Sequence, residues 1–233
     1  MEEIMSELAA VGPFFTADPQ APAEGDAGPG GFRPLSELYG AGLGGYVAEV
    51  GRRIGTGPDR VAASTAQLGI ASRLWSLALG AAALGGRVPD LAPDRVRWRL
   101  PRGGSLQLAL PAPRAVPGPA AAGFDALIEG NLRVLDASVR AGYGLSPKVL
   151  RGNSASALVG ALRVLTGRLP RTPYPPVPLV AALLEAGPLA GSGTFVHEEG
   201  LGFAFVRNSC CLYYRVEGAG LCGDCVLRTK RKA

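Results

Sequence analysis

Residues 61–86 read VAASTAQLGIASRLWSLALGAAALGG, the best candidate in the chain for either a membrane span or a buried core helix. Arg73 stands in the middle, where a charge costs roughly 2.5–3.5 kcal/mol in a membrane-inserted helix. The uncharged part, residues 74–86, is shorter than the roughly 20 residues that cross a bilayer. We therefore expect no membrane span but a buried helix, with Asp59 as its N-cap and Trp75 in the core.

Outside this stretch the pattern is mostly helical. Apolar spacing and capping residues predict further helices at residues 2–11, 47–54, 124–139, 146–166 and 179–185. Residues 16–34 are rich in Pro, Gly, Ala and Asp and have few large apolar side chains, which predicts a loop or a disordered segment. Prolines make residues 170–178 extended.

Two segments have the alternating pattern of β-strands. Val96, Trp98 and Leu100 alternate with arginines, and a second alternating run follows Gly103-Gly104, which predicts a hairpin. Its arginine face is expected to be solvated, with contact to an anionic ligand as the alternative. Residues 194–197 and 202–206 predict a second hairpin around a turn at 198–200.

The expected fold class is thus α+β, a mostly helical body with two β-hairpins and a cysteine-rich C-terminal segment. We expect a short helix and flexible linker in residues 1–34, the helical body in residues 35–193, and the cysteine-rich segment with a basic tail in residues 194–233.

The charge of the chain argues against nucleic-acid binding. The net charge is +5 and aromatic residues make up only 6% of the 233 residues, so the positive charge is spread thinly. One dense basic run closes the chain: Arg228, Lys230, Arg231 and Lys232. It is expected to be a solvated tail, with docking of an acidic partner as the alternative. The acidic start lacks the pattern of a secretory signal, so we expect a cytoplasmic protein with reduced thiols.

All four cysteines lie within residues 210–225, in the pattern C-C-x10-C-x2-C. Disulfides are disfavoured, because a bridge between Cys210 and Cys211 would be strained. Structural zinc suits Cys222 and Cys225, but adjacent cysteines tend to point apart, which hinders chelation of one ion. A [2Fe-2S] cluster has two metals and accommodates divergent thiolates more readily. Spacing alone leaves zinc and [2Fe-2S] both open.

Two stretches carry a family resemblance. RNSCCLYYR at residues 207–215, followed by CGDC at 222–225, resembles the C-terminal iron–sulfur segment of the FhuF-like ferric siderophore reductases. In that family an Arg, a Cys-Cys pair, an apolar–Tyr run and a Cys-x-x-Cys recur in this order. LSPKVLRGNSASAL at residues 145–158 is similar to the family's helix start around a Gly-Asn pair, with Arg151 where many relatives carry tryptophan.

The resemblance implies a [2Fe-2S] cluster on Cys210, Cys211, Cys222 and Cys225. It places four further residues near the cluster: Arg207, Tyr213, Tyr214 and Asn153. Arg207 is expected to donate hydrogen bonds to the cluster or offset its charge. Asn153 is expected to cap the helix that follows it, or else to line the substrate surface.

The resemblance also implies an activity, one-electron reduction of iron held by a siderophore of the hydroxamate type. His197 is expected to be a surface residue of a hairpin rather than a catalyst, and residues 40–44 lack the strand that precedes a nucleotide-binding loop. Electrons are therefore expected from a ferredoxin or a flavoprotein. A non-enzymatic iron–sulfur electron carrier or redox sensor, and a zinc-stabilised binding module, are the alternatives.

Overall fold

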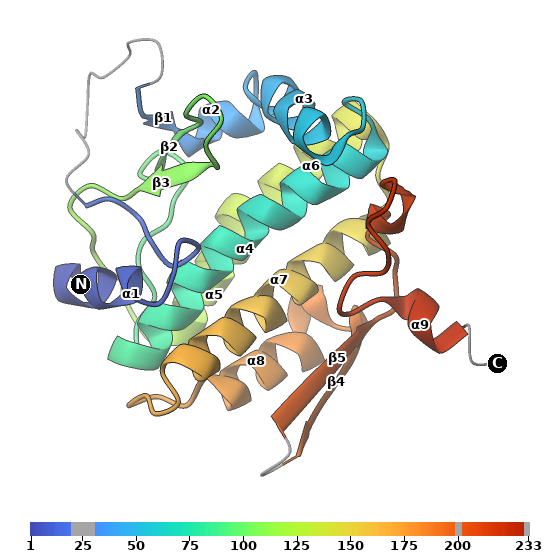
Figure 1. Ribbon diagram of the computed structural model, residues 1–233. Helices are drawn as coiled ribbons and strands as arrows, with labels where there is room; N and C mark the ends of the chain where they lie inside the picture. Colours follow the sequence, from blue (N-terminus) through green and yellow to red (C-terminus); the bar gives the residue numbers. More distant parts are fainter. Residues whose placement is uncertain (20–30, 199–201, 231–233) are drawn as a thin grey trace.

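The computed structural model describes residues 1–19, 31–198 and 202–230 (Figure 1). Its fold class is α+β, as predicted, with a helical body and two small antiparallel sheets. Two long helices, α4 (Arg60–Gly85) and α7 (Pro147–Arg168), lie side by side through the middle and pack extensively on each other. These two helices provide the surface on which the cysteine-rich segment rests.

Helix α4 is the predicted core helix. Asp59 caps it by accepting the backbone N–H groups of Val61 and Ala62 at 2.9 and 3.0 Å. In the described part of the chain it is the one helix long and apolar enough to cross a membrane, and 72% of its most apolar window is buried inside the protein. Arg73 is satisfied internally, because its Nε and Nη1 donate to the carbonyls of Leu106 and Gly69. Trp75 is fully buried, as predicted.

Shorter helices surround this pair. Helices α2 (Leu35–Tyr39) and α3 (Leu43–Ile54) precede α4, and α1 (Glu2–Ala9) packs against α4 from another side. Helix α8 (Pro176–Glu185) packs on α7 and is followed by a 3₁₀ turn, Gly187–Leu189. The predicted helix at 179–185 is thus confirmed, but it begins at Pro176, so the prediction of extended chain at residues 170–178 is wrong for its last three residues. Proline is well tolerated in a first helical turn.

The helix predicted at residues 124–139 contains an unpredicted π-helical turn. Helix α5 (Ala120–Leu127) continues into the π turn Ile128–Leu132 and then into α6 (Arg133–Tyr143). Asn131 lies buried in the turn, where its Oδ1 accepts from Tyr39 Oη at 2.8 Å and its Nδ2 donates to Leu91 O at 2.8 Å. These bonds hold a polar side chain inside the core.

The first predicted hairpin forms and gains a strand. β2 (Arg97–Arg99) and β3 (Gln107–Ala109) are antiparallel, and β1 (Arg33–Pro34) pairs with the other edge of β2. The prediction of loop or disorder at residues 16–34 is therefore wrong at Arg33–Pro34, which form β1, whereas residues 16–19 are irregular chain as predicted. Ala17 and Phe32 are buried, and a bridge joins Asp18 to Ala109. The rest of that prediction, residues 20–30, lies outside the described residues.

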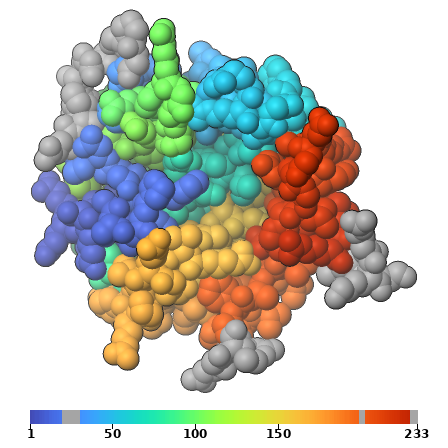
Figure 2. All heavy atoms as spheres, in the orientation of Figure 1, coloured from blue at the N-terminus to red at the C-terminus, as the bar shows by residue number. Residues whose placement is uncertain are grey.

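The second predicted hairpin, β4 (Gly193–Glu198) with β5 (Gly202–Arg207), leads directly into the cysteine-rich segment. Residues 199–201 of its turn lie outside the described residues. The segment continues through a 3₁₀ turn, Tyr213–Arg215, to α9 (Val226–Lys230). Figure 2 shows it on the molecular surface, next to α3 and α7. Arg231 and Lys232 of the predicted basic tail lie outside the described residues.

Candidate metal centre

The cysteine-rich segment is fastened to both central helices by hydrogen bonds. Ser64 Oγ of α4 donates to the carbonyl of Cys211 at 2.8 Å, and Ser209 Oγ donates to the carbonyl of Lys148, in the first turn of α7, at 2.8 Å. The backbone N–H of Arg207 donates to the carbonyl of Asp224 at 3.0 Å. This last bond brings the Cys-Cys half and the Cys-x-x-Cys half of the segment together.

The four cysteines are free thiols gathered at one place. Cys211 and Cys225 are buried, while Cys210 and Cys222 are half-buried. The thiol of Cys222 donates a hydrogen bond to that of Cys211, and charge interactions connect Cys210 with Cys211 and Cys225. The N–H of Leu212 donates to Cys210 Sγ at 3.3 Å. A single short segment therefore brings together all four sulfur atoms.

The thiols do not converge on a single point. Within the residues that the structure describes, no three or more His, Cys, Asp or Glu side chains are arranged to hold one metal ion. Four grouped thiols that are not arranged around one ion suit a centre that divides its ligands between two metals better than a tetrahedral zinc site.

The electrostatic environment favours the thiolate at Cys211 but disfavours it at Cys210 and Cys222. The hydrogen bond from Cys222 lowers the pKa of Cys211, with further lowering by the N–H of Tyr213 and by the positive charge of Arg207. The same hydrogen bond and burial raise the pKa of Cys222, and burial raises that of Cys210. Cys211 is therefore the first of its pair to become a thiolate.

Arg207 is a buried cation whose charge acts on the cysteines. Its side chain is only 1% exposed, and its charge interacts with Cys211, Cys222 and Cys210. Nη2 donates to Asn153 Oδ1 at 2.7 Å, whereas the buried Nε has no hydrogen-bond partner in the described protein. A buried cation with an unused donor needs a compensating anion. Asp224 also acts on the charge of Arg207, and an anionic tetrathiolate centre would supply further negative charge beside it, so the residues present fit an iron–sulfur cluster.

Asn153 holds Arg207 in place, which corrects the expectation that it caps a helix. It lies inside α7, fully buried, and Ser146 is the cap, accepting from the N–H of Val149 at 3.4 Å. Asn153 Nδ2 donates to Ser64 Oγ at 3.0 Å, and Ser64 in turn bonds to Cys211. Asn153 therefore connects Arg207 to the carbonyl of a cysteine through one serine.

The glycine before Asn153 is required by close packing. A Cβ atom at Gly152 would collide with Ser209 Oγ and would lie 3.0 Å from Arg207 Nη2. The Gly-Asn pair thus has a physical reason: glycine admits the cysteine-rich segment to the surface of α7, and asparagine binds its arginine.

The remaining predicted residues lie in different settings. The N–H of Tyr213 reaches Cys211, while Tyr214 is 42% exposed and its hydroxyl accepts a hydrogen bond from Arg215 Nε at 3.3 Å. His197 is exposed on β4, as expected of a surface residue of a hairpin. Of the arginine face predicted around β2, Arg99 stacks over Phe32 and donates to Gln107.

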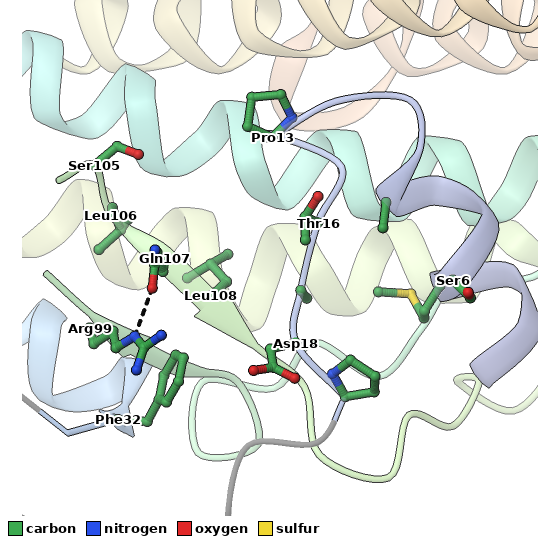
Figure 3. Close-up of a pocket in the computed structure, with 14 residues that line it drawn as sticks. Ser6, Pro13, Thr16, Asp18, Phe32, Arg99, Ser105, Leu106, Gln107 and Leu108 are labelled. Atoms are coloured by element: carbon green, nitrogen blue, oxygen red, sulfur yellow. Dashed lines mark hydrogen bonds between the residues drawn. The ribbon is translucent and has the colours of Figure 1, made fainter. Parts of the chain in front are cut away.

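Figure 3 shows the cavity beside that arginine face. It has a volume of about 550 Å³ and is lined by residues of α1, β3 and the connecting chain, including Met5, Phe32 and Leu108. It contains none of the four cysteines and lies on the side of the molecule away from them (Figure 1). The candidate metal centre is therefore separate from this cavity.

Several polar residues of the site escaped the sequence analysis. Ser64 supports Asn153, and Arg163 Nη2 of α7 lies 2.8 Å from Asp224 Oδ1, within the Cys-x-x-Cys turn. Gln67 Nε2, one turn after Ser64, donates to Asp136 Oδ1 at 2.9 Å, and burial raises the pKa of Asp136 to about 7. The available signal was the presence of Ser64 and Gln67 in a helix whose residues are mostly apolar.

A helical body that carries a buried arginine and four free thiols on a C-terminal segment has the arrangement of a candidate cysteine-ligated metal centre. Residues 207–227 match the family model described as the FhuF 2Fe-2S C-terminal domain. The match begins at Arg207, includes all four cysteines, and agrees with the resemblance noted in the sequence. This segment of the chain is thus similar to the C-terminal iron–sulfur domain of FhuF-like proteins. No match was found among curated proteins.

Proposed function

We propose that this protein is a ferric-siderophore reductase with a [2Fe-2S] cluster on Cys210, Cys211, Cys222 and Cys225. The observation that carries the proposal is the buried Arg207, which has an unpartnered Nε and a charge that interacts with three of the four free thiols inside the segment that matches the family model. When bound, such a cluster supplies one electron at a time. The substrate is Fe(III) held by a siderophore, of which we propose the hydroxamate type.

One electron is sufficient to release the metal. Fe(III) is a hard ion that hydroxamate oxygens hold tightly, whereas Fe(II) is softer and binds those oxygens far less well. For a one-electron couple, each ~59 mV of driving force changes the equilibrium tenfold. The role of the protein is therefore to set the potential and to bring the ferric complex close to the thiols.

The residues around the cysteines suit both the setting of the potential and the approach of the ferric complex. Arg207 offsets negative charge from the interior side, and the bonds from Asn153 and Ser64 fix its position. Cys211 and Cys225 are shielded from water, which raises the effect of each nearby charge. Cys210 and Cys222 are half-buried, so the centre has an edge that a large ferric complex can approach.

Electrons come from a separate protein in this proposal. We propose a cytoplasmic ferredoxin or flavoprotein as the donor. Such donors are often acidic, and Arg228, exposed on α9 just after Cys225, is the described start of the basic run that would attract them.

The test is a single-turnover reaction. Anaerobically purified protein is reduced with dithionite, freed of excess reductant and mixed with a ferric trihydroxamate. We expect cluster reoxidation and Fe(II) capture by a chelator to proceed at the same rate, with one Fe(II) formed per reduced cluster. Reoxidation without Fe(II) would refute the reductase proposal. Cys222→Ser serves as the control for Fe(II) that forms without the cluster.

An electron carrier or redox sensor is the second candidate function. The half-buried Cys210 and Cys222 and the exposed Tyr214 also suit transfer to another protein rather than to a small complex. The same reaction distinguishes them, because a carrier reoxidises with a partner protein but leaves the ferric trihydroxamate unreduced. A zinc-stabilised module, the third interpretation, lacks converging ligands within the described residues.

A further inference from the structure

We propose that a second pocket, next to the cysteine-rich segment, binds a free carboxylate of the ferric siderophore. Six residues line it: Lys148, Arg151, Gly191, Ser192, Asn208 and Ser209. This inference rests on the proposed reductase function and narrows its substrate class to ferric complexes that carry a pendant carboxylate.

The lining has the chemistry of an anion site. Lys148 and Arg151 both belong to the first two turns of α7, where the helix end also carries partial positive charge. None of the six lining residues is acidic, and neither cation pairs with a carboxylate among the described residues. Arg151 Nη1 donates only to the carbonyl of Ala190, at 3.3 Å, which leaves other donors of its guanidinium for a ligand.

A buried hydroxyl group independently indicates that the pocket binds a ligand. Ser192 is 5% exposed, and its Oγ has no hydrogen-bond partner within the described protein. Buried hydroxyl groups are normally hydrogen-bonded, so an unused one in the wall of a cationic pocket indicates a missing ligand. Asn208 and Ser209, in contrast, are already oriented by bonds to the carbonyls of Gly191 and Lys148.

Size and position determine what the pocket can accept. Its volume is about 240 Å³, below the roughly 300–1,000 Å³ typical of sites that enclose a drug-sized ligand. It therefore suits a pendant group rather than a whole ferric complex. Ser209 precedes Cys210 directly, and consecutive Cα atoms are about 3.8 Å apart. A ligand anchored here by its carboxylate keeps its iron at the edge of the cysteine centre.

Two derivatives of one siderophore make the test specific. Desferrioxamine B has a terminal amine that can be acetylated, which gives a neutral group, or succinylated, which gives a carboxylate. Gallium complexes of the two are redox-inert, so calorimetry on the cluster-loaded protein measures binding alone. We expect the succinyl complex to bind at least about tenfold more tightly, since hydrogen bonds to charged groups are among the stronger ones.

Substitutions in the pocket test whether its cations cause the preference for the succinyl complex. The double variant Lys148→Gln, Arg151→Gln should bind the two complexes with equal affinity. The single variant Lys148→Gln should reduce the preference for the succinyl complex. Because Lys148 is exposed, the single variant also tests the pocket if the double variant does not fold. Arg168→Gln is the matched control, because it removes a charge from an exposed position at the far end of the same helix. This control should keep the full preference.

The outcomes separate this inference from the proposed function. Equal affinity of the wild-type protein for both complexes would overturn the carboxylate site, even if both ferric complexes are reduced. A preference that disappears in the pocket variants would support the site, even if neither ferric complex is reduced, and the reductase function would then fail alone. If Lys148→Gln instead slows only electron delivery from an acidic ferredoxin, with no preference between the complexes, the carboxylate belongs to the donor protein and the inference is wrong.

Discussion

The contact between Arg207 and Asn153 makes a quantitative prediction. Arg207→Gln and Asn153→Ala each remove the 2.7 Å bond between Nη2 and Oδ1. A hydrogen bond to a charged group contributes about 1.5–3 kcal/mol, and each truncation also leaves a buried polar group with fewer partners. We expect each single variant to lose at least about 2 kcal/mol of unfolding free energy. The double variant should lose less than their sum, by a coupling energy of about 1.5–3 kcal/mol.

The assay is urea unfolding of the cluster-free chain, followed by its helical circular dichroism so that cluster loss does not enter the signal. Arg215→Gln is the matched control, because this exposed arginine lies in the same segment and its loss should change stability by no more than about 0.5 kcal/mol. A coupling energy below about 0.5 kcal/mol, or equal effects of Arg207→Gln and Arg215→Gln, would refute the role assigned to the buried pair.

Three further predictions follow from individual contacts. Cys222→Ser should bind fewer than two iron atoms per chain, and full iron content would remove this residue from the ligand set. Gly152→Ala should destabilise the protein by about 1–3 kcal/mol and lower its iron content, because the new Cβ collides with Ser209. The control is Gly160→Ala in the same helix, whose Cβ meets open space and which should be neutral or stabilising. The pKa of Asp136 is raised from 3.8 to about 7, so the free energy of unfolding should fall as pH rises from about 4 to 7 and should stay low above pH 7. Asp136→Asn should abolish this fall. At pH 8, urea unfolding should show that the variant is more stable by about 1–4 kcal/mol. Identical pH profiles of the two proteins would contradict that assignment.

The elements with strong local signals were predictable. Asp59 and Ser146 cap α4 and α7 as their positions indicated, and the alternation around Trp98 correctly marked the β2–β3 hairpin. These features depend on residues close in sequence, such as a capping side chain and the first helical N–H groups. The grouping of the four thiols was predictable for the same reason, because they lie within one short segment, whereas their spacing alone left zinc and [2Fe-2S] both open.

Contacts between distant residues were not predictable. The pairing of β1 with β2 joins Arg33 to Trp98, and no local pattern in a short segment beside a proline indicates it. Asn153 looked like a helix cap because asparagine favours that position. Its partners Ser64 and Arg207, however, lie far from it in the sequence, on either side. The sequence alone does not determine which polar groups meet inside the core, and the pocket at Ser192 is hidden for the same reason.

The most direct test of the central claim is the metal content of the centre. Protein purified without oxygen is analysed for iron, zinc and acid-labile sulfide, and its dithionite-reduced form is examined by electron paramagnetic resonance. A [2Fe-2S] cluster on Cys210, Cys211, Cys222 and Cys225 predicts two iron atoms and two sulfides per chain, with a paramagnetic signal that appears only on reduction. One zinc ion per chain, with no sulfide and no signal, would contradict it.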